Sequence, residues 1–373
     1  MARLPRALHP GAWWLWALGM AAAASRTTNP ILLLLIIAVV AFVVSARRTD
    51  APWARGFRAY VYLGLLVIGI RVVFRVLLDA QYGPHLLFTL PEVPLPDAVA
   101  GIRLGGAVSA EGMLAAIYDG LRLATLLLCI GAANTLANPK RLLQSMPSAL
   151  HEIGVAVTVA LSVAPQLIES GQRVRRARRL RGEPGRHFHI VREVALPVMT
   201  DALDRSLLLA AAMDSRGYGR TAAVARSMRA ATSGLLIGGI VAIAIGAYGL
   251  LDSTAPRYLG LPMLLGGVCL GWIGVMASGR RVERSRYRPD PWRIEEWGVS
   301  LVGISVAAVI VAVSTADPTA LHPSLQPLRW PELPLLPAAA VLLGILPAWI
   351  APPTRLPAAR RAPVVAAPLE QAA

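Results

Sequence analysis

The sequence predicts an all-α polytopic membrane protein with about eight transmembrane helices and a cytoplasmic helical insertion. Of its 373 residues 55% are hydrophobic and 16% are charged, and the mean hydropathy is +0.56. Soluble domains average about 25% charged residues. Apolar runs of nearly membrane-spanning length recur along the chain, and arginines gather between them. This composition excludes a soluble globular protein and a disordered one.

Eight apolar runs are the candidate spans, because a transmembrane helix needs about 20 mostly apolar residues. The six strong runs are 60–78, 113–134, 232–251, 258–278, 297–315 and 334–350. Two shorter runs, 12–24 and 30–44, precede them on either side of a turn-like segment from Arg26 to Pro30. The first run also fits a signal peptide, since Arg3 and Arg6 precede it and small residues end it. The second run follows almost at once, which favours a helical hairpin.

The positions of the arginines predict the orientation of the chain. The formal net charge is +16, from 37 Lys+Arg against 21 Asp+Glu. Short cytoplasmic loops of membrane proteins collect basic residues. With a cytoplasmic N-terminus, all basic clusters fall on the cytoplasmic side, and both termini are expected there. The clusters lie at 47–58, 140–141, 173–186, 280–293 and 355–361. This placement accounts for the charge without a nucleic-acid partner.

Two further apolar stretches, 153–168 and 194–213, are expected to remain in the cytoplasm. A span at the first would move the densest basic cluster outside, against the positive-inside rule. The second contains Asp201, Asp204 and Arg205, and each charge at mid-bilayer costs about 2.5–3.5 kcal/mol. The predicted organisation is a four-span N-terminal domain at 1–137, a cytoplasmic insertion at 138–229, two spans at 230–279, and a basic loop, an added two-span hairpin and a tail at 280–373.

The insertion is predicted to form three helices. The first begins at Pro139, the second ends at Arg181-Gly182, and the third runs from about His189 to Arg216-Gly217, with each glycine in a position suited to a helix C-cap. The third helix has an apolar stripe at helical spacing, formed by Leu196, Met199, Leu203, Leu207, Ala210 and Met213. It carries Asp201 and Arg205 as an i,i+4 pair elsewhere. The second and third helices are apolar over more than one stripe. We therefore expect them to contact a partner protein at the membrane surface as well as each other.

Several kinds of chemistry find no support in the sequence. Lys140 is the only lysine and follows Pro139, so the chain lacks the Gly-Lys-Ser/Thr of a P-loop ATPase. It has no Gly-x-Ser-x-Gly elbow and no His/Asp/Glu cluster with metal-ligand spacing. Cys129 and Cys269 lie in apolar runs, which suits buried side chains. We expect no catalytic residue, no metal site and no cofactor in this chain.

Two helix ends in the insertion resemble a known family. Segments 176–182 (Arg-Ala-Arg-Arg-Leu-Arg-Gly) and 212–219 (Ala-Met-Asp-Ser-Arg-Gly-Tyr-Gly) lie between apolar spans. They resemble the paired Ala-Arg-Gly-type signatures of the transmembrane T component of energy-coupling factor (ECF) transporters, a family that includes the cobalt-uptake permease subunit. His9-Pro10, Asn29-Pro30 and residues 138–172 also fit the layout of that family. The resemblance covers about residues 9–280.

The chain departs from this family in two respects. Leu180 and Ser215 stand where the family typically has alanine before Arg-Gly. The last two predicted spans are additional to the family core.

The resemblance implies a scaffold that couples two cytosolic ATPase subunits to a small membrane-embedded substrate-binding subunit, for vitamin or metal-ion uptake across a bacterial or archaeal cell (inner) membrane. ATP would be bound by the partner subunits. The implied ATPase-coupling residues are Arg178, Arg181, Gly182, Ser215, Arg216 and Gly217. The implied platform for the binding subunit consists of Leu196, Met199, Leu203 and Leu207.

A polytopic membrane enzyme acting on lipid-linked phosphate substrates is the alternative. Its arginines would hold the phosphate group. Co-purification separates the two functions, because a coupling subunit should bring two ATPase chains with it.

Overall fold

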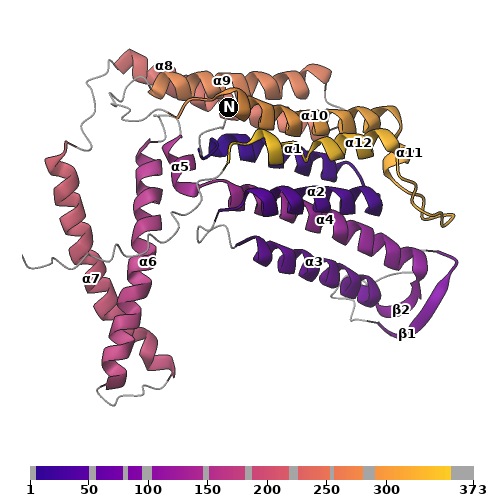
Figure 1. Ribbon diagram of the computed structural model, residues 1–373, viewed down its shortest axis with the longest axis horizontal. Coiled ribbons are helices and arrows are strands. Elements are labelled where there is room, and N and C mark those ends of the chain that lie inside the picture. Colours follow the sequence, from indigo (N-terminus) through magenta and orange to yellow (C-terminus); the bar gives the residue numbers. More distant parts are fainter. Residues whose placement is uncertain are drawn as a thin grey trace, which may run out of the picture. The chain divides into compact units, whose positions relative to one another are not determined.

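The computed structural model (Figure 1) describes residues 6–49, 56–78, 83–94, 103–145, 151–180, 187–217, 226–252, 256–279 and 290–353. Its contacts divide the chain into two compact units. The first consists of Met1–Leu142 and Asp290–Ala373, and the second of Leu143–Pro289. The chain therefore passes from one unit to the other twice, and each unit is described separately.

The first unit is a helical bundle with one β-hairpin. Its elements are α1 (Pro10–Ser25), α2 (Pro30–Arg47), α3 (Phe57–Leu78), β1 (Leu86–Pro94), β2 (Arg103–Ser109), α4 (Ala110–Leu136), α10 (Ile294–Ala316), α11 (Pro318–Leu321), α12 (Leu335–Leu343) and α13 (Pro347–Ile350). The short helix α5 (Pro139–Gln144) contains the first boundary between the units.

A side chain followed by proline begins helices α1, α2 and α5. His9 Nδ1 accepts a hydrogen bond from the Gly11 amide at 3.0 Å, and Asn29 Oδ1 accepts one from the Ile31 amide at 3.0 Å. Asn138 Oδ1 accepts from the Lys140 amide at 3.0 Å. Proline suits the first helical position because its missing N–H would have no intrahelical partner there. These residue pairs therefore fix the starts of α1, α2 and α5.

The core of the first unit lies where α1 meets α10 and α2 meets α12. Trp16, Ile36 and Val306 are fully buried there. Helices α1 and α10 approach closely, because a Cβ atom at Gly19 would lie 2.1 Å from the carbonyl oxygen of Gly303. Small residues allow such close backbone contact between membrane helices. The C-terminal helices, predicted as an added hairpin, thus share one core with the N-terminal helices.

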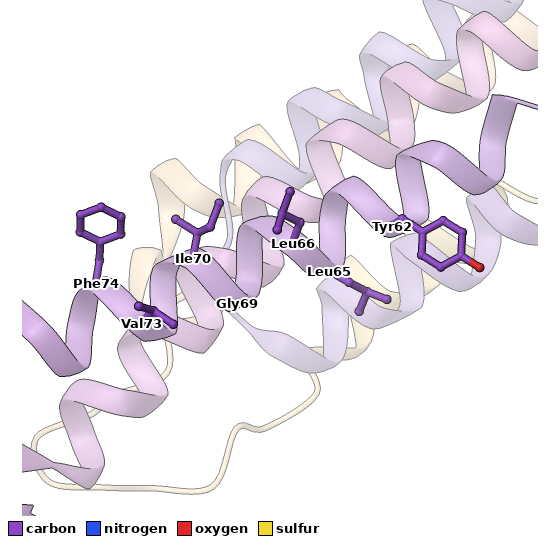
Figure 2. A pocket seen from close by; sticks show the side chains of 7 residues that line it. All are labelled: Tyr62, Leu65, Leu66, Gly69, Ile70, Val73 and Phe74. Atoms are coloured by element: carbon purple, nitrogen blue, oxygen red, sulfur yellow. The ribbon is translucent and has the colours of Figure 1, made fainter. Parts of the chain in front are cut away.

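Helix α3 packs on α4 along one side and exposes the other. A Cβ atom at Gly120 of α4 would lie 3.0 Å from the Cα atom of Ile68 in α3. Figure 2 shows the opposite side of α3, where apolar side chains line a shallow groove around Gly69. These side chains belong to Tyr62, Leu65, Leu66, Ile70, Val73 and Phe74. Exposed apolar side chains on a helix of 22 residues are typical of a membrane span.

The β-hairpin was not predicted from the sequence, which indicated only a loop between the third and fourth spans. β1 and β2 pair antiparallel from Leu86 opposite Ser109 to Pro94 opposite Arg103, with register shifts on the way. Gly105 has a φ of 88°, and a Cβ there would lie 2.3 Å from the Pro91 carbonyl oxygen. Prolines within β1 lower the strand signal of this segment. The bulge around Gly105 accommodates the resulting irregularity.

The second unit contains two helix pairs. Its elements are α6 (His151–Leu180), α7 (His187–Ser215), α8 (Arg226–Leu251), the 3-10 turn η4 (Arg257–Leu259) and α9 (Leu261–Gly279). Helices α8 and α9 pack through small residues, since a Cβ at Gly239 would lie 2.7 Å from the backbone nitrogen of Gly271. Helices α6 and α7 form the other pair.

The predicted all-α polytopic membrane fold is confirmed. Within the described ranges, seven helices are long and apolar enough to cross a membrane. Six of them, α2, α3, α4, α8, α9 and α10, coincide with predicted spans. The seventh is Ile153–Arg178 in α6, a stretch that the charge pattern predicts to lie in the cytoplasm. Helix α1 has 16 residues, and the run 334–350 is broken near Gly344 into α12 and α13. The number of eight spans and the side on which α6 lies remain predictions.

Candidate functional site

Helices α6 and α7 cross each other and form the candidate site (Figure 1). The crossing includes Gly171 of α6, where a Cβ atom would lie 4.0 Å from methyl carbons of Val194 and Val198. Each helix contains an internal proline, Pro165 in α6 and Pro197 in α7. One side of α6 therefore packs against one side of α7.

A polar cluster around Asp201 joins the two helices at the crossing. The hydroxyl of Ser170, which is buried, donates to Asp201 Oδ2 at 2.7 Å. Arg205 Nε donates to Asp201 Oδ1 at 3.0 Å and its Nη1 to Gln166 Oε1 at 3.2 Å. Arg173 lies 3.7 Å from Asp201 Oδ2. Hydrogen bonds from Arg205 and then Ser170 lower the pKa of the Asp201 carboxyl, against the opposing effect of partial burial. Asp201 therefore stays ionised near neutral pH.

The sequence analysis predicted only part of this cluster. The pairing of Asp201 with Arg205, one turn apart on α7, is confirmed. The bonds to α6 were missed, because no sequence signal relates Gln166 or Ser170 to the next helix in the chain. A polar residue within an apolar helical stretch nevertheless indicates that a hydrogen-bond partner lies on a neighbouring element.

The four predicted platform residues lie along an exposed side of α7. The side-chain exposures of Leu196, Met199, Leu203 and Leu207 are 72%, 57%, 62% and 68%. We call these four residues the α7 stripe. Leu207 is nine residues from Val198, which is about two and a half helical turns. The α7 stripe therefore lies on the side of α7 opposite its contact with α6.

A second apolar stripe runs along α6, for which the sequence predicted surplus apolar surface without naming its residues. Ile153, Val157, Leu161 and Ile168 are 58%, 38%, 43% and 63% exposed. Their spacing of four and seven residues places them on one side of a helix. The same periodicity that identified the α7 stripe would have found this one.

The end of α7 has the geometry that its sequence predicts. Gly217 has a φ of 73°, and its amide donates to the Asp214 carbonyl at 2.8 Å, while the Arg216 amide donates to the Met213 carbonyl at 3.1 Å. Glycine takes this left-handed conformation without steric cost and so ends the helix. The Ser215 hydroxyl donates to the Ala212 carbonyl at 3.0 Å. The side chain of Arg216 is exposed next to this turn.

The end of α6 is described as far as Leu180, which is 89% exposed. Arg178 lies in its last turn, whereas the predicted coupling residues Arg181 and Gly182 lie outside the described residues. Because six residues separate α6 from α7, the helix pair turns back on itself (Figure 1). A helix of 29 residues is about 44 Å long. Arg178 and Arg216 therefore mark opposite ends of the pair.

The described residues contain no group of three or more His, Cys, Asp or Glu side chains that could hold a metal ion. What the site offers is apolar surface, exposed arginine at a helix end and a polar crossing. Such features suit protein contacts.

Comparisons with known proteins match this chain to a family model and to a relative. A family model described as CbiQ, cobalt transport protein, matches residues 1–227. The energy-coupling factor transporter transmembrane protein EcfT of Leuconostoc gelidum subsp. gasicomitatum is 31% identical over 196 residues, which is 48% of this chain and 67% of the relative. The family match includes α1 to α7 and ends in the first turn of α8. Helices α10 to α13 lie beyond it.

Proposed function

The chain belongs to the CbiQ family of cobalt transport proteins and is a multi-pass membrane component of an ECF-type transporter, and from this premise we propose that it is the scaffold that couples ATP hydrolysis to substrate uptake. In this role it transmits the motion of two cytosolic ATPase subunits to a small membrane substrate-binding subunit. Membership in a transporter family favours this function over an enzyme acting on lipid-linked phosphates. The expected cargo is a vitamin or a metal ion.

The observation that carries the proposal is that α7 has two apolar sides with different environments. One side packs against α6 through Val194 and Val198, whereas the α7 stripe is 57–72% exposed. Exposed apolar surface at helical spacing is typical of a protein contact. We assign the α7 stripe to the substrate-binding subunit.

The helix ends supply the contacts to the ATPases. The guanidinium of Arg216 presents a rigid fork of donors that suits carboxylate and carbonyl groups in a groove of a partner. Arg181, with Arg178 before it, would do the same at the end of α6. Because these ends lie at opposite ends of the helix pair, each can engage a different ATPase subunit. ATP would be bound by those subunits.

The crossing of α6 and α7 provides a route by which movement of one helix end reaches the other. When the ATPases close or separate, the two helix ends move relative to each other, and the helices shear about the cluster at Asp201. The α7 stripe would move with α7 and carry the binding subunit with it. The membrane is that of a bacterial or archaeal cell, with both termini in the cytoplasm.

Co-purification tests the proposal. The complex is expressed with both ATPases and isolated through this chain, and we expect Arg216→Glu or Arg181→Glu to release the ATPases while this chain stays folded. Arg175→Glu is the matched control, since Arg175 is exposed on α6 but precedes the helix-end signature. If Arg216→Glu and Arg181→Glu both retain ATPases and full ATP-driven uptake, the helix ends do not couple the ATPases.

A further inference from the structure

The chain leaves the first unit and re-enters it at two neighbouring points. The chain leaves that unit after Leu142 and returns at Asp290. Arg141, one residue before the first passage, forms an ion pair through its Nη2 with Asp290 Oδ2. The side chains are 26% and 36% exposed. The points at which the chain leaves and re-enters the first unit, 149 residues apart in sequence, are therefore joined by a pair of charges.

Further bonds fix Arg141 to the beginning of the chain. Its Nη1 donates to the carbonyl oxygens of Ala7 and Leu8, each at 3.1 Å. Asn138 Oδ1 accepts from the Arg141 amide at 3.4 Å, at the start of α5. The guanidinium thus contacts two segments at once, the N-terminal segment and the start of the returning chain.

The returning chain is anchored to the same N-terminal segment. The carboxylate of Glu296, which is fully buried, accepts hydrogen bonds from Arg6 Nη2 at 2.9 Å, from the His9 amide at 3.3 Å and from the Arg293 amide at 3.0 Å. The rings of His9 and Trp292 lie 5.3 Å apart. Residues 6–9 therefore bind both Arg141, just before the chain leaves the first unit, and the segment that follows its return at Asp290.

We propose that Arg141 and Asp290 are positioning residues, and we call the pair the clasp. It holds together the two points at which the rest of the chain joins the first unit, so that a force arriving through either connection acts on that unit at one place. Without it, each connection would move independently and part of the motion would be lost. This proposal rests on the coupling function proposed above. Asp290 lies outside the part of the chain that the family model matches, so the C-terminal segment contributes one of the two residues of the clasp.

The clasp should affect coupling more than folding. Exposed ion pairs contribute little to the stability of a protein. The core that joins α10 to α1 also remains when the pair is lost. The two roles are therefore distinguished by the ratio of substrate transported to ATP hydrolysed. Loss of a coupling contact lowers this ratio, whereas loss of a contact that only stabilises the fold changes protein yield and thermal stability.

The test uses the full complex with its ATPases and binding subunit in proteoliposomes. Asp290→Asn should lower the substrate transported per ATP at least fivefold with an unchanged melting temperature, and Asp290→Glu should restore it to within twofold. Glu295→Gln is the matched control, because it removes one negative charge at the same end of α10, beside Arg6 at 3.4 Å. It should leave the ratio unchanged.

A cross-link then tests whether the clasp must stay closed. In a chain with no other cysteines, Arg141→Cys with Asp290→Cys should be uncoupled, and a short bismaleimide joining the two positions should restore coupling. Normal coupling in Asp290→Asn, or blocked transport after cross-linking, overturns the clasp alone. Failure of the wild-type chain to bind any ATPase overturns the proposed function and the coupling role of the clasp together.

Discussion

Replacing Leu203 and Leu207 of the α7 stripe by glutamine should weaken binding of the substrate-binding subunit. Their side chains are 62% and 68% exposed, so about two thirds of each remains available to a partner. Fully burying a leucine side chain contributes about 1.5–3 kcal/mol, which leaves about 1–2 kcal/mol per residue on docking. The double variant should therefore lose about 2–4 kcal/mol, or roughly 30- to 900-fold in affinity.

The assay is a titration of the binding subunit against this chain in nanodiscs with its ATPases, with Kd as the measured quantity. The matched control is Leu208→Gln, because Leu208 is 72% exposed but lies about 100° around the helix from Leu207. The control should change Kd less than threefold, and neither variant should alter the melting temperature. An unchanged Kd in the double variant, or an equal loss in the control, would refute the assignment of the α7 stripe.

Three further outcomes are expected. Asp201→Asn should increase hydrogen exchange at the crossing of α6 and α7. Because the hydrogen bond from Arg205 holds the pKa of Asp201 below its ordinary value of 3.8, the wild-type protection should persist from pH 7 to pH 5. It should fall only as the pH drops through that lowered pKa. Gly303→Val should cost about 1–3 kcal/mol or more and lower the melting temperature, because a Cβ there would lie 2.4 Å from the backbone of α1, whereas Gly266→Ala points into open space and should be neutral. A cysteine at Leu180, in an otherwise cysteine-free chain, should react with an impermeant maleimide only from the cytoplasmic side, and external labelling would contradict the placement of α6.

Most of the correct predictions came from local sequence features, such as apolar runs, glycine positions and helical periodicity. Six apolar runs became helices of spanning length, and the end of α7 at Gly217 follows from the conformational freedom of glycine next to Arg216. The α7 stripe follows from a repeat of three and four residues. Each of these signals lies within one stretch of chain and depends on few distant contacts.

Contacts between distant segments could not be predicted in the same way. Nothing in the run from Ile294 indicates that α10 packs on α1, because the close approach of Gly19 and Gly303 depends on the whole bundle. The bond from Ser170 to Asp201 likewise joins two helices whose register is set only by their crossing. The β-hairpin was hidden by Pro91 and Pro94, which disfavour a strand locally while the paired backbone accommodates them.

The interleaving of the two units imposes an order on the synthesis of the protein. Helices α1 and α2 emerge from the ribosome first, but their partners α10 and α12 follow only after residues 143–289. At about 5–20 residues per second, translation places roughly 12–50 s between the end of α2 and the start of α10. During that interval the side of α1 that carries Trp16 and Gly19 lacks its final neighbour. The N-terminal bundle therefore completes its core only when almost the whole chain has been made.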